Sequence, residues 1–484
     1  MVDSDNTANL DFFRESYIVF GFNIADKIVS FIIFLFFARY FEPIEFGGAY
    51  AVIGVSAITL GVPHALDVAV RKRISEDTQK KNRLFVAGAA FDTAYVIVCS
   101  GVLFLLIETF VFRYEFLALT GVAHLFGRSL LNLAERTIEG LGKPGASEFV
   151  EFLDGVITAA LRLVLILGAS VGVEGLIYGP AFSGILLAIG VYLYLFGTEA
   201  EIPLREDIFS LTEFFKWTVM SRIFHTTSRN SPVALLGFGL GGTIASQFKT
   251  AKNLTLPGTL VRKGILKSVF LHTSISSEKE TSDYSKIEDG VELSQVITLP
   301  LVGGALVLGD QIMVTTYGSD YANTGYILLA LMIVMTAETY LGLIRNTLNG
   351  FDTPRYVAYM NSVIVVLMLP ALILSSVFSD SFIFFLLSIV IGKTIGVCIG
   401  LYYLKSSLGI VPIDKQITAE RFISAGIMTG VIYYLNTLVN TFNLVNLSLV
   451  IIAGGITYFS VLLTVRTKTR ELLRKSVEEA LQDS

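Results

Sequence analysis

The sequence predicts an all-α integral membrane protein with about 14 transmembrane helices. Of its 484 residues, 53% are hydrophobic and only 16% are charged, against roughly 25% charged residues in soluble domains. The mean hydropathy is +0.67, and apolar runs long enough to cross a bilayer recur along the chain. The isoelectric point near 5.6 argues against a nucleic-acid partner, since nucleic-acid binders are usually basic.

The predicted spans follow one another as apolar runs of about 20 residues, the length that crosses the hydrocarbon core. We place them at 15–38, 46–70, 84–108, 115–138, 146–170, 174–197, 211–235, 243–270, 291–316, 322–348, 356–378, 381–404, 420–440 and 443–465. Turn residues separate several of them, such as Glu42-Pro43 and the glycines from Gly237 to Gly242. The polar, acidic start lacks the basic segment of a signal peptide, so we expect no cleaved leader.

Basic residues are distributed unevenly over the predicted loops. With the N-terminus in the cytoplasm, the even-numbered loops and the tail hold 25 Lys and Arg residues, whereas the odd-numbered loops hold only Arg39 and Arg113. Cytoplasmic loops of membrane proteins carry the excess of Lys and Arg. We therefore expect a multi-pass protein of the cytoplasmic membrane with both termini in the cytoplasm, and a cytoplasmic tail at 467–484.

A repeated stop signal predicts that the chain contains two related halves. Glu139-Gly-Leu-Gly-Lys-Pro144 follows the fourth span and Asn349-Gly-Phe-Asp-Thr-Pro354 follows the tenth, with Gly and Pro each 210 residues apart. Glycine after a helix and proline beyond it form a stop signal, and its recurrence at the same rank indicates a repeat. We expect an N-terminal lobe at 1–198, a C-terminal lobe at 199–410, each of six helices, and two further helices at 411–466.

The seventh and eighth spans are the most polar. Hydropathy alone also allows residues 197–292 to form a soluble cytoplasmic insert between twelve helices. Orientation does not separate the two arrangements, because removing two helices preserves the parity of the loops. The repeat favours the 14-helix arrangement, since six helices must lie between the two stop signals.

The stretch from Phe214 to Ser277 holds eight Lys and Arg but no Asp or Glu. Its helical spacing places Arg222 and Arg229 on one face of the seventh span, and Lys249 and Lys252 on one face of the eighth. A charge facing lipid costs about 2.5–3.5 kcal/mol, so such residues usually face an interior. Four cations at close range match a phosphate or pyrophosphate. The alternative is that the two lysines reach the interface and hold lipid headgroups.

Three further cations lie within the predicted spans and are lesser candidates for the same substrate: Lys27, Arg128 and Arg162. Arg128 and Arg162 have acids on their own helices, and Asp26 neighbours Lys27, so structural ion pairs are the alternative. The polar faces of five helices together predict a wet central cavity. Three acids are candidates for coupling H⁺ or Na⁺, with nothing to select among them: Asp26, Asp67 and Asp154.

Other motifs predict packing rather than chemistry. Gly237 to Gly242 lacks the Gly-Lys-Ser/Thr of a phosphate loop, so we expect a turn between helices. The four histidines, His64, His124, His225 and His272, have no ligand-spaced partner, so we expect no metal site and no cofactor. Cys99 and Cys398 fit small apolar fillers. Gly392, Gly396 and Gly400 form a GxxxGxxxG pattern that predicts close helix packing.

Two short motifs carry a resemblance to a known family. Ala38-Arg-Tyr-Phe-Glu-Pro-Ile-Glu-Phe-Gly47 resembles the hallmark of the polysaccharide-flippase branch of the multidrug/oligosaccharidyl-lipid/polysaccharide exporter superfamily. The segment from Asn349 to Pro354 is similar to that family's Asn-Gly-x-x-x-Pro segment, although Phe41-Glu42-Pro43 departs from the usual Leu-Gly-Pro. The resemblance implies a transporter, not an enzyme: an alternating-access flippase for lipid-linked sugars, with a cationic cavity between two lobes.

We therefore hypothesise a flippase for a polyprenyl-linked oligosaccharide, used in cell-surface polysaccharide or glycoprotein glycan assembly. Arg222, Arg229, Lys249 and Lys252 would hold its phosphate or diphosphate, and glycan-assembly enzymes are the expected protein partners. One alternative is a multidrug or organic-ion exporter of the same superfamily, which would need a net acidic cavity. Another is a membrane glycosyltransferase or glycan polymerase, which would need acidic catalytic residues in a sizeable loop.

Overall fold

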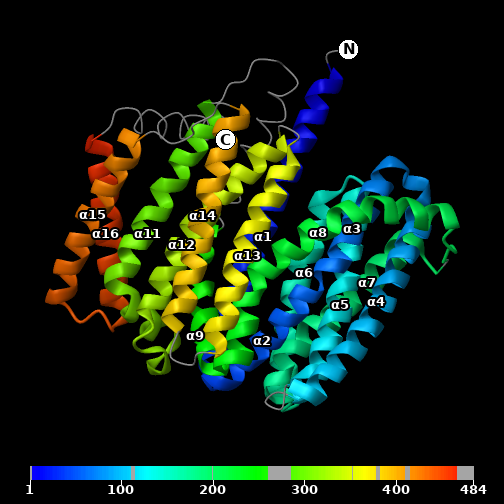
Figure 1. The fold of residues 1–484 in the computed structure, drawn as a ribbon, viewed down its shortest axis with the longest axis horizontal. Helices are drawn as coiled ribbons and strands as arrows, with labels where there is room; N and C mark the ends of the chain where they lie inside the picture. The colour runs from blue at the N-terminus through cyan, green and yellow to red at the C-terminus, as the bar shows by residue number, and fades with distance from the viewer. Residues whose placement is uncertain are drawn as a thin grey trace. The chain divides into compact units, whose positions relative to one another are not determined.

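The computed structural model is built of helices (Figure 1). It describes residues 3–110, 115–198, 200–259, 285–350, 353–377, 382–408 and 415–465. Within these ranges, seven helices are long and apolar enough to cross a membrane, or eight if one bent pair forms a single span. The all-α membrane class is confirmed, whereas the count of 14 helices and the cytoplasmic position of the termini stay predictions.

The chain divides into two compact units. The first comprises Met1–Lys249 and Leu372–Asp380, and the second comprises Thr250–Ala371 and Ser381–Ser484. The predicted lobes at 1–198 and 199–410, and the helices at 411–466, stay predictions.

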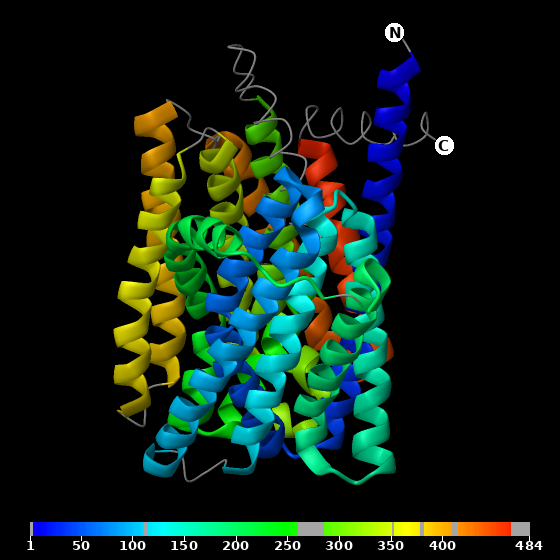
Figure 2. The same cartoon turned by 90° about the vertical axis from the view of Figure 1, so that its right-hand side faces the viewer.

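The first unit is a bundle in which α5 is central, because it packs against α2, α3, α4, α6 and α7. Figure 2 shows α4 and α5 side by side, in blue and cyan. The helices are α1 (Asp3–Tyr40), α2 (Pro43–Thr59), α3 (Gly61–Glu76), α4 (Lys81–Phe110), α5 (Glu115–Gly140), α6 (Pro144–Leu163), α7 (Gly175–Phe196), α8 (Arg205–Leu235) and the start of α9 (Gly242–Asn253).

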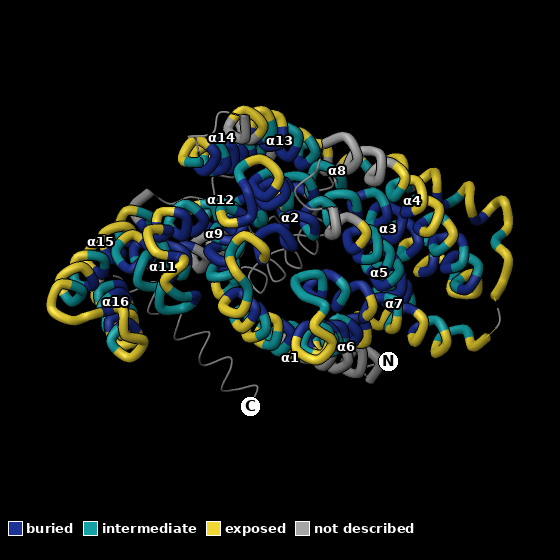
Figure 3. The backbone as a smooth tube through the Cα atoms, turned by 90° about the horizontal axis from the view of Figure 1, so that it is seen from below, coloured by how far each residue is buried: buried dark blue, intermediate teal, exposed yellow. Residues whose placement is uncertain are grey.

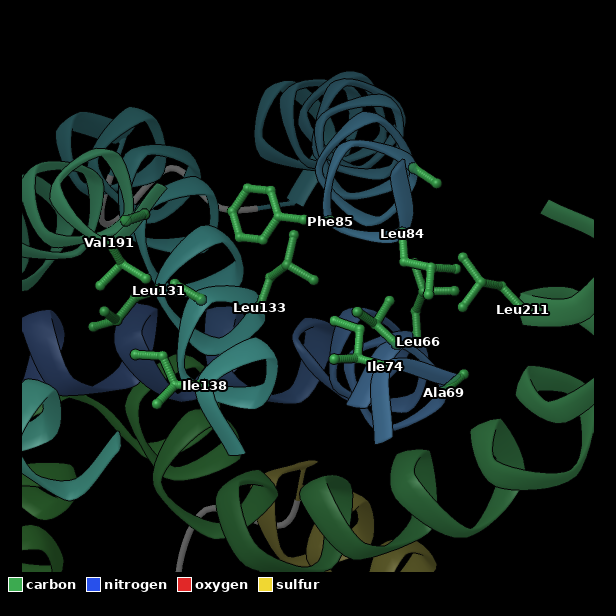
Figure 4. Close-up of a cluster of buried hydrophobic side chains, with 14 of the residues drawn as sticks. Leu66, Ala69, Ile74, Leu84, Phe85, Leu131, Leu133, Ile138, Val191 and Leu211 are labelled. Atoms are coloured by element: carbon green, nitrogen blue, oxygen red, sulfur yellow. The ribbon is translucent and has the colours of Figure 1, made fainter. Parts of the chain in front are cut away.

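An apolar core holds six of these helices together, with α6 contributing Val150 (Figure 4). Its buried side chains include Leu66, Ala69 and Ile74 of α3, Leu84 and Phe85 of α4, Leu131, Leu133 and Ile138 of α5, Val191 of α7 and Leu211 of α8. Burying one such Leu, Ile, Val or Phe side chain contributes about 1.5–3 kcal/mol.

Helix α8 is part of this bundle. It packs along α2 and α3, and the hydroxyl of Thr218 donates to the carbonyl of Ala65 on α3 at 3.2 Å. Residues 205–235 therefore belong to the helical unit, which argues against the soluble-insert arrangement for this segment.

The predicted span at 46–70 is two helices, α2 and α3, bent by 46° at the break between Thr59 and Gly61. Pro63 has no N–H, so it cannot donate to the carbonyl of Thr59 one turn earlier. The hydroxyl of Tyr95 on α4 donates to that carbonyl instead, at 3.0 Å. The N–H that Pro63 lacks explains the bend. The hydroxyl of Tyr95 then supplies the hydrogen bond that the carbonyl of Thr59 would otherwise lack.

The glycine cluster at 237–242 forms the turn between α8 and α9, as predicted. Gly241 has a φ of 105°, a backbone conformation that glycine adopts without strain. A Cβ at Gly237 would clash with Ala51, and a Cβ at Gly242 would clash with the carbonyl of Ile44. The cluster therefore lets this turn lie directly against the start of α2.

The second unit contains α11 (Ser285–Tyr317), α12 (Gly325–Gly350), most of α13 (Pro354–Val377), α14 (Phe382–Leu408), α15 (Lys415–Leu438) and α16 (Leu444–Val465). Helix α11 packs against α12 and α15, and α15 packs against α16. Apolar side chains such as Leu449 and Ile456 are 60% and 63% exposed, as expected for a lipid-facing surface. Figure 3 shows exposed segments along α15 and α16.

The predicted glycine packing face on α14 is confirmed in this unit. A Cβ at Gly396 would clash with Ile364 of α13, and one at Gly400 would lie 2.8 Å from Ile344 of α12. Among its described residues, the second unit also contains two buried cations. Lys393 of α14 pairs with Glu338 at 2.5 Å, and Arg421 of α15 donates to the amide oxygen of Gln295 at 2.9 Å. Arg421 lies in the second turn of α15 and is 2% exposed.

Candidate anion site in the first unit

A polar pocket of about 230 Å³ lies between α1, α5, α6 and α7 of the first unit. Its charged lining consists of three acids and three bases: Asp26, Glu151 and Asp154, and Lys27, Arg128 and Arg162. Pockets for drug-sized ligands hold about 300–1,000 Å³. This pocket therefore has room for a head group rather than for a whole oligosaccharide.

Small residues bring the pocket helices together. A Cβ at Gly155 on α6 would clash with the carboxylate of Asp26 on α1. A Cβ at Gly179 on α7 would lie 2.7 Å from Cγ of Arg162. The glycines therefore allow α1 and α7 to approach α6 closely enough for charged side chains of different helices to meet.

Two of the three pocket cations are neutralised by carboxylates. Lys27 contacts Asp26 and lies 3.5 Å from Glu151. Arg128 donates to Asp154 at 2.5 Å, and the hydroxyl of Ser183 donates to the same carboxylate at 2.7 Å. The expected ion pairs are confirmed for Lys27 and Arg128, except that the partner of Arg128 comes from α6 and not from its own helix.

The third pocket cation, Arg162, is held by a backbone carbonyl. Its Nε donates to the carbonyl oxygen of Leu176 on α7 at 3.1 Å. Pro180 lies four residues beyond Leu176 and has no N–H, so the helix leaves this carbonyl without its usual donor. Within the described ranges no carboxylate pairs with Arg162. The residue is therefore positioned without losing its net positive charge, contrary to the ion pair expected from acids on its own helix.

Lys249 lies beside aromatic rings. Its Nζ is 4.7 Å from the ring centre of Tyr50 and 5.8 Å from that of Phe34, an attraction worth about 0.5–2 kcal/mol. The positive charges of Arg229 and Arg162 repel that of Lys249. Arg162 also interacts electrostatically with the hydroxyl of Tyr50. Among the described residues, Lys249 has no carboxylate partner either.

We call Arg162, Lys249 and Tyr50 the Arg162–Lys249 cluster. It is the part of the site where positive charge gathers without a carboxylate. Sequence reasoning missed Tyr50 and Phe34, because an aromatic residue in an apolar run is typical of packing and carries no other signal.

The structure does not bring together all four cations of the acid-free stretch. Arg229 lies near Lys249. Arg222 instead interacts electrostatically with a different set of charged residues: Arg136, Arg71, Asp67 and Glu139. Lys252 belongs to the second unit. Arg222 and Arg229 share a helix face, yet seven residues correspond to about 10 Å of helix rise, so they reach different neighbours.

The three candidate coupling acids have different surroundings. Asp26 and Asp154 pair with Lys27 and Arg128, whereas Asp67 is 1% exposed and neither of its carboxylate oxygens has a hydrogen-bond partner. In the part of the chain that the structure describes, no group of three or more His, Cys, Asp or Glu residues is arranged to hold a metal ion.

Comparison with known proteins adds independent evidence. Residues 146–325 match a family model described as "Polysaccharide biosynthesis protein". The chain is 25% identical over 488 residues to "Probable flippase AglR" of Haloferax volcanii, covering 97% of this chain and 99% of that protein. It is 24% identical over 475 residues to "Probable low-salt glycan biosynthesis flippase Agl15" of the same organism, covering 94% and 96%.

The fold is similar to that of a solved flippase. A structure of "Lipid II flippase MurJ, inward closed conformation" matches with a TM-score of 0.75 at 15% identity, covering 93% of this chain and 99% of that one. The similarity extends along nearly the whole chain. The similar proteins are transporters rather than enzymes.

Proposed function

We propose that this chain is a member of the polysaccharide-flippase branch of the multidrug/oligosaccharidyl-lipid/polysaccharide exporter superfamily and that it moves a lipid-linked oligosaccharide across the cytoplasmic membrane. The lipid carrier is a polyprenyl phosphate or diphosphate, and the glycan serves cell-surface polysaccharide or glycoprotein assembly. The relatives named as flippases support the transport class, and the family model supports polysaccharide biosynthesis as its setting.

The observation that carries the proposal is the Arg162–Lys249 cluster. Withdrawing a cation from water without a counter-charge is costly, so two partly buried cations close together favour a bound anion. A guanidinium and an ammonium donate charge-assisted hydrogen bonds to phosphate oxygens, and the hydroxyl of Tyr50 adds a further donor. In this proposal Arg162 and Lys249 hold the phosphate, with Arg229 beside them.

The remaining predicted cations have supporting roles in the proposal. The pairs of Lys27 with Asp26 and of Arg128 with Asp154 fix the walls of the pocket, which is sized for the head group. The glycan crosses through water while the polyprenyl tail stays in lipid, as the two lobes alternate their access. Arg222 and Lys252 act on the substrate elsewhere along its path.

An organic-cation exporter of the same superfamily is disfavoured by the same cluster. Such a transporter needs a net acidic cavity, whereas the three carboxylates of this pocket are balanced by its three bases, and Lys249 beside Arg162 adds a further positive charge.

The proposal is tested with the double substitution Arg162→Gln and Lys249→Gln. Hydrogen bonds to charged groups contribute about 1.5–3 kcal/mol each, so removing each cation should weaken phosphate binding about 10- to 100-fold. The measurement is flipping of a fluorescent polyprenyl-diphosphate oligosaccharide in proteoliposomes. Lys80→Gln removes a cation with a 46% exposed side chain, paired with Asp77, and should flip normally. Normal flipping by the double variant would contradict the site.

A further inference from the structure

Two carboxyl groups outside the pocket are completely buried on neighbouring helices, α3 and α4. Contacts with α4 lie on either side of the two aspartates, because a Cβ at Gly88 would lie 3.3 Å from Val70 of α3 and the hydroxyl of Tyr95 donates to the carbonyl of Thr59, just before α3. Asp67 on α3 is 1% exposed and Asp92 on α4 is 0% exposed, and α3 packs against α4. All four carboxyl oxygens lack a hydrogen-bond partner. Of the charged residues around Asp67, Asp92 has the strongest electrostatic interaction with it.

Part of the surroundings of this pair is apolar. Leu66, next to Asp67 on α3, and Ala69, two residues after it, belong to the apolar core together with Leu84 of α4 (Figure 4). Two carboxylates that meet in an apolar interior cannot both stay ionised, because each pays desolvation and repels the other. Asp26 and Asp154 differ, since each has a cation within contact.

The other charged groups that act on Asp67 come from two neighbouring helices. They are Arg136 and Glu135 of α5 and Arg222 of α8. Arg136 is already engaged by Glu139 at 2.6 Å, and Glu135 adds a further negative charge. On α3 itself, His64 lies 2.6 Å from the amide of Asn132. Arg222 therefore offsets one negative charge of the pair, and a second needs a proton.

We propose that Asp67 and Asp92 share one proton at neutral pH and form a proton-binding site of this transporter. One carboxyl keeps its proton as an O–H, which leaves a single negative charge on the pair. No bond other than this O–H forms or breaks. A metal ion is disfavoured, because the described residues offer no group of three or more His, Cys, Asp or Glu ligands.

Electrostatic interactions through Glu135 connect Asp67 to the pocket. The negative charge of Glu135 repels that of Asp67. Glu135 is in turn attracted by Arg128 and repelled by Glu151 and Asp154, three residues that line the pocket. An anion bound in the pocket adds negative charge near Glu135, so it strengthens proton binding at the pair, and the effect is reciprocal. Only this coupling role rests on the proposed function; the shared proton does not.

Proton binding is tested by infrared spectroscopy of the purified full chain in bilayers. At neutral pH the wild type should show the C=O band of a protonated carboxyl group, and Asp67→Asn and Asp92→Asn should each abolish it. Asp207→Asn is the matched control: Asp207 is 4% exposed but ion-paired with Arg83 at 3.4 Å, so its replacement should leave the band unchanged.

A band that persists in both Asn variants, or that is absent from the wild type, overturns the proposal. If one single variant does not fold, the double variant Asp67→Asn with Asp92→Asn, in which the repulsion is gone, gives the same comparison.

Coupling is measured separately, as flipping of the fluorescent polyprenyl-diphosphate probe under an imposed pH gradient. The gradient should accelerate flipping by the wild type and have no effect on Asp67→Asn. An equal response of both proteins overturns the coupling role. Absence of flipping by the wild type, with the infrared band present, contradicts the proposed function and leaves the proton site standing.

Discussion

At the scale of the residue, prolines decide where two polar side chains lie. Pro63 frees the carbonyl of Thr59, which accepts the hydroxyl of Tyr95. Pro180 frees the carbonyl of Leu176, which accepts the guanidinium of Arg162. A carbonyl holds an arginine without cancelling its charge, whereas a carboxylate would neutralise it. This difference leaves Arg162 available to an anion.

Pro180→Ala tests this arrangement. Alanine supplies an N–H to the Leu176 carbonyl, which then competes with Arg162. A net hydrogen bond is worth about 0.5–1.5 kcal/mol, so pyrophosphate affinity should fall by up to about tenfold, while the melting temperature stays equal or rises. Calorimetric titration with inorganic pyrophosphate and a thermal melt measure both quantities.

Pro370→Ala is the control for that substitution, since Pro370 lies inside α13 of the second unit. It should leave pyrophosphate affinity unchanged. Equal affinity of Pro180→Ala and the wild type would contradict the role given to the freed carbonyl.

Residue spacing predicted the pocket cations but not their partners. The sequence placed Lys27, Arg128 and Arg162 inside the membrane, and all three line the pocket. Periodicity gives the face on which a residue lies, yet it does not say which helix packs there. The partner of Arg128 on α6 and the backbone acceptor of Arg162 on α7 therefore required the structure.

At the scale of the element, the start of α2 and the turn between α8 and α9 depend on contact between backbones. A Cβ at Gly47 would clash with the carbonyl of Gly242. Gly47 is the last residue of the motif that carries the family resemblance, so the contact gives that glycine a physical reason. Segments almost 200 residues apart in sequence meet there.

Gly47→Ala should destabilise the protein strongly, because the methyl group has no space and backbone must move. Overpacking costs about 1–3 kcal/mol or more, which should lower the thermal melting temperature by several degrees. Gly101→Ala is the matched control, since nothing lies within 4 Å of a Cβ there and alanine favours a helix by about 0.5–1 kcal/mol. A melting temperature of Gly47→Ala at or above that of the wild type would contradict the close contact.

Hydropathy predicted many of the apolar spans but merged α2 with α3. An average over a window of about 20 residues does not register one missing N–H, which is what Pro63 contributes at the bend. The turn at 237–242 was predictable because glycines at such density have few other uses. Its docking against α2 was not, since no local signal names the partner.

At the scale of the whole molecule, the proposed function requires two lobes that alternate their access. This arrangement predicts that single cysteines at positions 222, 229, 249 and 252, in a background without Cys99 and Cys398, react with water-soluble reagents from both sides of the membrane. Added lipid-linked glycan should block the reaction. The measurement is mass-spectrometric labelling in right-side-out and inverted vesicles.

A cysteine at Leu133, which is fully buried, should stay unlabelled from either side. Labelling of the four positions from the cytoplasmic side alone, unaffected by glycan, would contradict alternating access and restore the soluble-insert arrangement. The same vesicles also measure the orientation of the protein in the membrane. It is predicted from 25 Lys and Arg residues in the cytoplasmic loops and tail against two in the opposite loops.

The hydrogen bond from Thr218 to Ala65 joins α8 to α3 two residues before Asp67. The residue next to Thr218 is Trp217, and it is the single tryptophan of the chain. The tryptophan fluorescence of the unlabelled protein therefore comes from the residue next to this hydrogen bond in the sequence. Stopped-flow emission from the native chain can time events at this joint without a dye or an engineered cysteine.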